Sequence, residues 1–306
     1  MGSALVRRLL AESCEVVIVD DLSKGSPENL GPEQHKVTLI ASDVSAGMDS
    51  ILLRFQPEIV FHLAAMHFIP DCDADPLRCL QINAEGTRVV LSAAAALDQP
   101  AAVILASSAA VYAPGNEAHQ EEDALGPLDV YGYSKRWAEE LTSNYANRTH
   151  AGVGIARLFN VFGPGETNPH LIPSIISQLQ SGETLRLGNL SSKRDYIFVD
   201  DVADALVRMG THCHSGESVT LNLGSGRTYT GMEVVDSLIG LSTRHATRHA
   251  RPLLTVDPGR VRTVDRPILH ANYDLARKVL SWAPATSLQA GLQASWQSPV
   301  GAGVIL

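Results

Sequence analysis

The sequence predicts an α/β fold in which helices cover both faces of a parallel β-sheet. In the first half of the chain, short β-branched runs alternate with segments of helical periodicity. Strands that alternate with helices form βαβ units, because parallel neighbours need a long crossover connection. Hydrophobic residues make up 45% of the 306 residues and charged residues 19%, which is enough apolar material for a sizeable core.

Five strands are predicted in this first half. Each is a short apolar run that fits a strand buried on both faces, such as VVIVD at residues 16–20. The other four runs are 36–41, 59–63, 102–107 and 153–159. The helices predicted before and between them are 1–12, 45–55, 77–96 and 131–147.

After residue 160 the alternation breaks, and Gly, Pro, Asn and Ser become frequent. Gly210 is expected to end one helix of this half, because glycine is the usual residue just beyond a helix C-terminus. The predicted elements are helices at 173–181, 200–209, 272–281 and 287–295 and a strand at 219–223. We predict a large domain of residues 1–159, to which 193–223 return, and a smaller α/β domain interleaved with it, made of 160–192 and 224–306.

Charge and cysteine content exclude several classes of protein. Lys and Arg number 24 and Asp and Glu 33, so the net charge of −9 argues against nucleic acid or an anionic membrane as partner. Four scattered cysteines are too few for a disulfide scaffold. No apolar stretch reaches the roughly 18 residues that span a bilayer, and no signal peptide is recognisable. These features predict a soluble, cytoplasmic protein.

The most informative motif is YGYSK at residues 131–135, downstream of Ser107 and Ser108 at a predicted strand end. Positions i and i+4 share a helix face, so Lys135 is expected beside Tyr131. A neighbouring ammonium favours the phenolate and is expected to lower the pKa of the tyrosine. The hydroxyl of Ser108 is placed to share the same substrate oxygen. This combination predicts a tyrosine acid/base with a serine and a lysine as helpers.

Two acids follow predicted strands. Asp20 closes the VVIVD run, where an acid of a dinucleotide-binding fold accepts hydrogen bonds from the adenosine ribose. Asp43 follows the next strand and suits the adenine edge. Each acid taken alone is equally well explained as a solvent-facing strand end.

Residues 211–214 (THCH) resemble a metal-binding run. No second ligand pair stands at zinc-finger spacing, so the run is expected to be a loop. No metal site is predicted from the sequence.

Several segments together resemble the extended short-chain dehydrogenase/reductases, and among them the nucleotide-sugar epimerase/dehydratase family. They are VVIVDDLSKG (16–25), SDV (42–44), FHLAA (61–65), INAEGT (82–87), SSAAVY (107–112), YGYSK (131–135), RLFNVFGPG (157–165), HLIPSII (170–176), RDYIFVDDVADAL (194–206) and NLGSG (222–226). The resemblance runs over nearly the whole chain. It implies a Rossmann-like doubly wound parallel sheet, NAD as cofactor and a nucleotide-diphosphate sugar as substrate.

The resemblance also implies roles for individual residues. The catalytic set would be Ser108, Tyr131 and Lys135. The residues expected around NAD are Gly2, Asp20, Asp43, Val44, Leu63, Ala64, Ala65, Asn83, Ser107, Tyr131, Lys135 and Phe159. Those expected to face the nucleotide sugar are His67, Asn160, Leu171, Arg194, Arg260, Arg262 and Arg266. Forked guanidinium donors suit a diphosphate, and the choice among the last three arginines stays open.

The reaction is predicted from the pair that follows Ser108. In the family, 4,6-dehydratases typically carry Asp-Glu at these positions, where this chain has Ala109 and Ala110. Elimination of water needs a proton donor and a base, and a methyl group supplies neither. The expected activity is therefore 4-epimerisation by transient oxidation at C4. A 4-ketoreductase and, through the resemblance of residues 187–196 to GDP-mannose dehydratases, a 4,6-dehydratase are the alternatives.

The start of the chain departs from the family pattern. Relatives begin with a strand and a G-x-x-G-x-x-G loop, whereas Gly2 here matches only the last glycine of that loop. We expect the first strand of the sheet and most of the loop to be missing. Either the start is an internal Met of a longer product, or a short chain with poor NAD affinity acts as a binding or scaffold protein. Family members often pair through two long helices, so a homodimer is expected.

Overall fold

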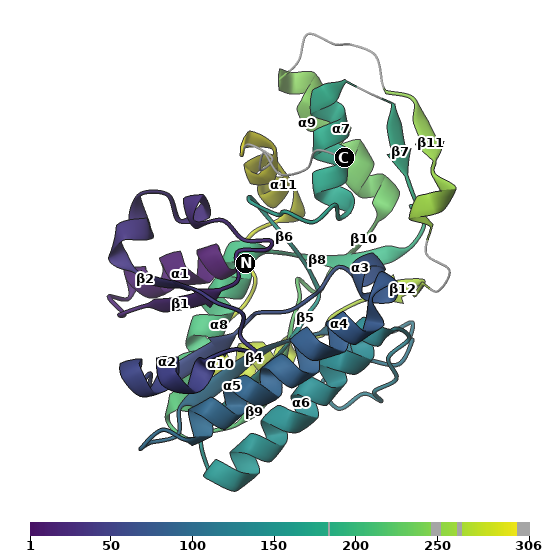
Figure 1. Cartoon of the computed structure of the whole chain (residues 1–306). Coiled ribbons are helices and arrows are strands. Elements are labelled where there is room, and N and C mark those ends of the chain that lie inside the picture. The colour runs from purple at the N-terminus through teal and green to yellow at the C-terminus, as the bar shows by residue number, and fades with distance from the viewer. Residues whose placement is uncertain (183, 246–251, 262–264, 299–306) are drawn as a thin grey trace.

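The computed structural model of the chain describes residues 1–182, 184–245, 252–261 and 265–298 (Figure 1). Its central feature is a four-stranded parallel sheet with the strand order β3-β4-β5-β9. These strands are β3 (Ile59–His62), β4 (Ala102–Ser108), β5 (Val153–Leu158) and β9 (Val219–Leu223). The carboxyl ends of neighbouring parallel strands lie at one edge of a sheet, and the candidate site is found there.

The first two strands form a separate parallel pair. β1 (Val17–Asp20) pairs with β2 (Thr38–Ala41) and with no other described strand. Within the described residues no strand joins β1 to β3, so the two sheets are not hydrogen-bonded to each other.

The four-stranded sheet lies between two layers of helices. α1 (Gly2–Ala11) and α8 (Val199–His214) cover one face, where Leu5 shares a core cluster with Ile104 of β4. The opposite face packs on α2 (Met48–Phe55), α5 (Gly86–Ala95) and α6 (Val130–Thr149), where Val103 is buried. Alternate residues of β4 therefore enter different cores, which explains why its sequence is apolar throughout.

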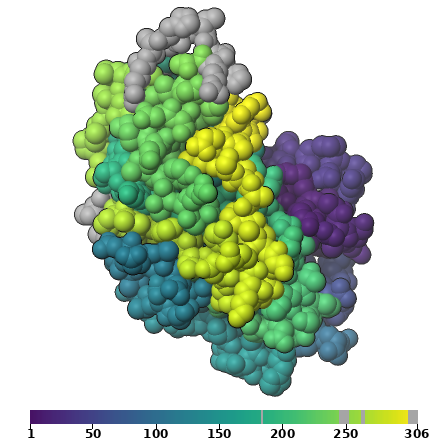
Figure 2. All heavy atoms as spheres, turned by 180° about the vertical axis from the view of Figure 1, so that it is seen from behind, coloured from purple at the N-terminus to yellow at the C-terminus, as the bar shows by residue number. Residues whose placement is uncertain are grey.

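The rest of the second half forms two further sheets. β8 (Lys193–Phe198) pairs antiparallel with β10 (Thr228–Thr230) and parallel with β12 (Ile268–Leu269) and β6 (Asn160–Phe162). β7 (Leu185–Leu187) pairs with β11 (Leu254–Val256). α7 (Leu171–Ser181) and α9 (Gly231–His245) pack beside them. α10 (Asp274–Leu280) lies against α8, and α11 (Leu288–Gln297) lies against α9. Both belong to the yellow end of the chain that faces the viewer in Figure 2.

Three sequence expectations need correction. β8 does not return to the large sheet, although α8 and β9 of the segment 193–223 do. The predicted helix 77–96 is split into α4 (Pro76–Leu80), a π-helical turn at Gln81–Glu85 and α5. α8 passes through Gly210 and includes residues 211–214, where the sequence predicts a loop. A side chain at Gly210 would stand 2.7 Å from the Phe61 ring. That glycine serves close helix–sheet packing rather than helix termination. The division into two domains stays a prediction.

No helix in the described part of the chain combines the length and the apolar character needed to cross a membrane.

Candidate functional site

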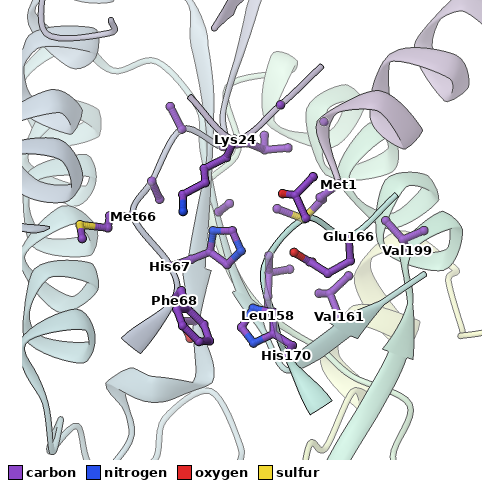
Figure 3. Close-up of a pocket in the computed structure, with 18 of the residues that line it drawn as sticks. Met1, Lys24, Met66, His67, Phe68, Leu158, Val161, Glu166, His170 and Val199 are labelled. Carbon is purple, nitrogen blue, oxygen red and sulfur yellow. The ribbon is translucent and has the colours of Figure 1, made fainter. Parts of the chain in front are cut away.

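A cavity of about 2330 Å³ extends from the space between β1 and β3 to the carboxyl ends of β3, β4 and β5 (Figure 3). Open α/β sheets bind their ligands at this edge. All but two of the predicted site residues line it: Gly2, Asp20, Asp43, Val44, Leu63, Ala64, Ala65, His67, Ser107, Ser108, Tyr131, Lys135, Phe159, Asn160, Leu171, Arg194, Arg260 and Arg266. Arg262 lies outside the described residues, and Asn83 is not part of the wall.

The structure brings Ser108, Tyr131 and Lys135 together at the cavity wall. Ser108 ends β4, and Tyr131 lies in the first turn of α6. Asp129 caps that helix by accepting the N–H of Gly132 at 2.7 Å. A side chain at Gly132 would stand 2.7 Å from the carbonyl oxygen of Ala110, so glycine lets the helix approach the strand end closely.

The protonation of this set differs from the sequence expectation. Burial raises the pKa of the Tyr131 phenol, and its hydrogen bond with Ser108 only partly opposes that rise. The Nζ of Lys135 donates to the carbonyl oxygen of Ala106 at 2.9 Å. Burial lowers the pKa of this ammonium to about 8. In the chain alone, desolvation thus outweighs the predicted effect of the lysine on the tyrosine pKa.

Ser107 faces a buried ion pair rather than Ser108 and Tyr131. Its hydroxyl donates to Oε1 of Glu139, and that carboxylate is paired with Arg157 at 2.8 Å. Arg157 also donates to the hydroxyl of Tyr112 at 3.0 Å. This network ties β4, β5 and α6 together directly beneath the cavity.

Asn83 holds the loop that follows β3. Its Oδ1 accepts the N–H of Met66 at 2.7 Å, and its Nδ2 donates to the Met66 carbonyl at 2.9 Å. The same Nδ2 donates to Oγ of Ser134 on α6 at 2.9 Å. Asn83 is 1% exposed. It does not line the cavity itself but holds the backbone of Met66, which does.

Two polar atoms of the wall are buried without a hydrogen-bond partner. They are Nη1 of Arg266 and Oδ1 of Asn160. Arg266 is 7% exposed, and its other terminal nitrogen donates to the carbonyl oxygen of Ala110 at 2.9 Å. Burying a polar group without a partner is costly, so both atoms are signs of a ligand site. Among the described candidates, this favours Arg266 over Arg260 as a substrate-binding arginine.

The other two described arginines are tied to their surroundings. Arg194 forms an ion pair with Asp265 and donates to the carbonyl oxygen of Arg266 at 2.8 Å. Arg260 is 41% exposed and pairs with Asp257 at 3.4 Å. Arg194 therefore orders the segment that carries Arg266.

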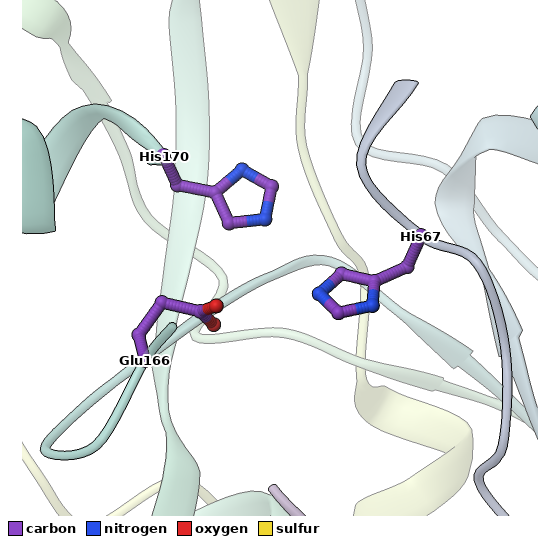
Figure 4. A group of neighbouring side chains, drawn as sticks. All are labelled: His67, Glu166 and His170. Atoms are coloured by element: carbon purple, nitrogen blue, oxygen red, sulfur yellow. The ribbon is translucent and has the colours of Figure 1, made fainter. Parts of the chain in front are cut away.

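A second polar group of the wall combines His67 with two residues that the sequence did not single out. His67, Glu166 and His170 each offer a ligand atom, and these atoms lie within 4.8 Å of one another (Figure 4). Nδ2 of Asn168 contacts Nε2 of His67 at 3.0 Å across 101 positions of sequence. Glu166 and His170 are four positions apart but lie in a loop, and His67 lies about 100 positions before them, so only the fold brings the three together.

Comparison with known proteins matches this architecture to one family. A profile described as the NAD dependent epimerase/dehydratase family matches residues 1–224. The chain is 31% identical to a UDP-glucose 4-epimerase of Mycolicibacterium smegmatis, over 95% of this chain and 93% of the relative. It belongs to the NAD-dependent epimerase/dehydratase family.

Other relatives carry out different reactions. A GDP-6-deoxy-D-mannose reductase of Pseudomonas aeruginosa is 28% identical over 90% of each chain, and UDP-glucuronic acid decarboxylases also match. The solved UDP-glucose 4-epimerase of Brucella ovis in complex with NAD aligns with a TM-score of 0.84 and 25% identity, covering 96% of this chain and 94% of that one. This confirms the predicted Rossmann-like fold. The family spans epimerases, reductases and decarboxylases, so membership alone does not fix the reaction.

The cavity residues fit the NAD of this family chemically. The carboxylate of Asp20 stands at the end of β1 and suits a ribose diol. Asp43 is held by Ser45 and Arg78, which lower the pKa of its carboxyl. Val44, Leu63 and Ala64 supply apolar surface, and Lys135 supplies a buried ammonium. The α1 N-terminus at Gly2 opens into the same space and suits a pyrophosphate.

Proposed function

We propose that the chain is an NAD-dependent nucleotide-sugar 4-epimerase. The observation that carries the proposal is the placing of Ser108, Tyr131 and Lys135 on one wall of the cavity, with alanine at the next two positions after Ser108. Ala109 is 1% exposed and Ala110 lines the wall, so neither position brings an acid or a base to the sugar. Epimerisation at C4 needs a single acid/base, which Tyr131 supplies.

In this proposal the phenol of Tyr131 exchanges a proton with the sugar O4, while the hydroxyl of Ser108 holds the same oxygen. Bound NAD would supply the hydride acceptor and donor for C4. Lys135 keeps a positive charge at the wall below pH 8, where it favours the phenolate once substrate excludes water.

NAD contacts are assigned to the predicted wall residues. These are Gly2, Asp20, Asp43, Val44, Leu63, Ala64, Ala65 and Phe159, with Tyr131 and Lys135 at the catalytic end. Ser107 and Asn83 act as positioning residues instead, the first through Glu139 and the second through Met66.

The nucleotide sugar is assigned to the side of the cavity that carries the unpartnered atoms. Nη1 of Arg266 is proposed to bind an oxygen of the substrate, and Oδ1 of Asn160 a hydroxyl. Arg194, Leu171, Arg260 and His67 complete this side. A planar guanidinium suits a diphosphate because it donates two parallel hydrogen bonds.

The test is incubation of the purified chain with a panel of nucleotide sugars, with the C4 configuration followed by NMR. The expected product is the 4-epimer without net formation of NADH. A 6-deoxy-4-keto product would instead establish the 4,6-dehydratase. Failure of the chain to bind NAD on titration would refute the epimerase and favour a non-catalytic binding or scaffold protein.

A 4-ketoreductase is the second candidate. It uses the same tyrosine, serine and lysine, and the similarity to a GDP-6-deoxy-D-mannose reductase supports it. A ketoreductase consumes one reduced cofactor per sugar, whereas an epimerase consumes none. Loss of NADH absorbance with a 4-keto sugar, without epimerisation of the parent sugars, would decide for the reductase.

We also propose a homodimer through the outer face of α4, the following turn and α6. A groove on this face is lined by Leu77, Leu80, Trp137 and Leu141, among others. Leu77 is 73% exposed and Trp137 46%, which is unusual for side chains of this size. Light scattering should give twice the chain mass, and Leu77→Glu should give a monomer. Leu53→Glu, at a 50% exposed leucine of α2, is the matched control that should stay dimeric.

A further inference from the structure

A second part of the cavity wall carries a compact set of nitrogen and oxygen donors, of which the proposed function assigns only His67, to the substrate side. His67 lies in the loop after β3, whereas Glu166 and His170 lie in the loop between β6 and α7. All three line the cavity and point toward one another (Figures 3 and 4). Their ligand atoms lie within 4.8 Å of one another.

Neighbouring groups fix the orientation of these side chains. His67 donates a ring N–H to the Ala65 backbone, and its Nε2 contacts Asn168. Oε1 of Glu166 accepts the backbone N–H of Asn168 at 2.8 Å, and Asn168 is 3% exposed. The rings of His67 and His170 are stacked with centroids 5.7 Å apart. Backbone bonds of this kind are typical of the outer shell that orients metal ligands.

From this arrangement we propose that His67, Glu166 and His170 bind one divalent transition-metal ion in the cavity wall. Two imidazoles and one carboxylate are a donor set that suits zinc. Three protein ligands leave one position of a tetrahedral ion for an oxygen ligand, which is water in the absence of substrate. The donors of one tetrahedral zinc lie about 3.4 Å apart, so side-chain shifts of roughly 1 Å close the site. Because the other ring nitrogen of His67 donates to Ala65, Nε2 is the ligand atom, and the ion takes the place of its contact with Asn168.

His67 is exposed and Glu166 and His170 are half-buried, so an ion can reach the three side chains from the cavity. This inference is independent of the epimerase proposal, since it concerns binding and not turnover.

The experiment measures zinc directly. The full chain, stripped with a chelator, is titrated with Zn²⁺ by calorimetry at pH 7, and a separate metal-free sample is loaded with Co²⁺ to read the ligand field by absorbance. One ion per chain is expected, with a cobalt spectrum of a four- or five-coordinate site. Glu166→Gln, His67→Ala and His170→Ala should each weaken binding at least tenfold, because even outer-shell changes typically cost 10–100-fold.

The matched controls are His35→Ala and Glu117→Gln, which alter exposed residues outside the cavity wall and should bind as the parent does. Glu166→Gln keeps the shape of the side chain, and its thermal unfolding without metal should match the parent. The proposal is overturned if the parent binds no zinc stoichiometrically. It is equally overturned if the three variants bind normally while Cys14→Ser loses the ion, because Cys14 is the exposed thiol among the four cysteines.

Discussion

The two walls of the cavity are built in different ways. One wall carries Ser108, Tyr131 and Lys135, which come from a strand end and one turn of the adjoining helix. The other carries His67, Glu166 and His170, which come from two loops about 100 positions apart. The first rests on β4, which is buried along nearly all its length, and on the inner face of α6, whereas the second depends on Asn83 and Asn168 to hold its loops.

This difference separates the chemistry of the walls. Lys135 is buried, and desolvation sets its pKa. On the other wall, His67 is exposed and Glu166 and His170 are half-buried, and contacts between loops set the orientation of these side chains. We infer that the first wall performs the proton transfer and the second accepts an ion or an oxygen ligand. The predictions below test the two walls separately.

The largest effect is expected at Tyr131. Tyr131→Phe removes the phenol that exchanges the O4 proton, and general acid/base groups contribute about 10²–10⁴-fold to rate. We expect kcat for epimerisation to fall by about that factor, while zinc affinity stays as in the parent. Steady-state kinetics and calorimetry measure the two quantities. A variant that turns over at the parental rate would show that the first wall has another role.

Arg266 should affect binding more than turnover. Arg266→Met removes the buried Nη1 and the bond to Ala110 but retains an unbranched side chain. A hydrogen bond to a charged group contributes about 1.5–3 kcal/mol, so the substrate KM should rise by roughly 10–150-fold with a smaller change in kcat. Arg277→Ala, at an arginine outside the cavity wall, is the control. An equal fall of kcat at unchanged KM would contradict this assignment.

The sequence predicted the first wall well because its residues are local. Tyr131 and Lys135 are four positions apart on a helix, so periodicity places these two together. The place of Ser108 beside them followed from its position at a strand end and from the resemblance to the family. The direction of the Tyr131 pKa was wrong because sequence carries no measure of burial. Asn83 was assigned to the cofactor because its neighbours match a family motif, yet its amide is fully used by Met66 and Ser134.

The second wall escaped prediction for a physical reason. His67 alone is indistinguishable from any polar loop residue, and Glu166 and His170 stand in a Gly- and Pro-rich segment with no periodicity. Only the packing of the loop after β3 against the loop after β6 brings them together. Gly210 is a similar case. The sequence predicted a helix end there, whereas the structure has a glycine because a side chain at this position would clash with the Phe61 ring.

The pH dependence isolates Lys135 on the first wall. Burial lowers the pKa of this ammonium to about 8, while the thiols of Cys79 and Cys72 and the Glu139 carboxylate oppose the shift. A lowered pKa means that the positive charge is present below pH 8 and is lost above it. The kcat/KM of the free enzyme should therefore fall above pH 8, by about tenfold per pH unit. Lys135→Arg keeps the charge at higher pH and should abolish this fall. A fall that persists in the arginine variant would assign it to another group.

The smallest effect is expected at Asn83, which connects the walls through Met66 and Ser134. Asn83→Leu leaves the buried Met66 backbone without its partners, at a cost of about 1–3 kcal/mol in the free energy of unfolding. Because Met66 directly precedes His67, zinc affinity should fall as well, but by less than in Glu166→Gln.

Thr142→Val is the matched control for Asn83→Leu, since it removes a fully buried hydroxyl of α6 that bonds Ala138 rather than the loop after β3. It should lower stability without changing zinc affinity. If both variants weaken zinc binding equally, the zinc affinity of the second wall follows the free energy of unfolding of the whole chain rather than the loop after β3. If only Asn83→Leu does, the loop anchor itself sets the geometry of the second wall, and the two walls are coupled through one amide.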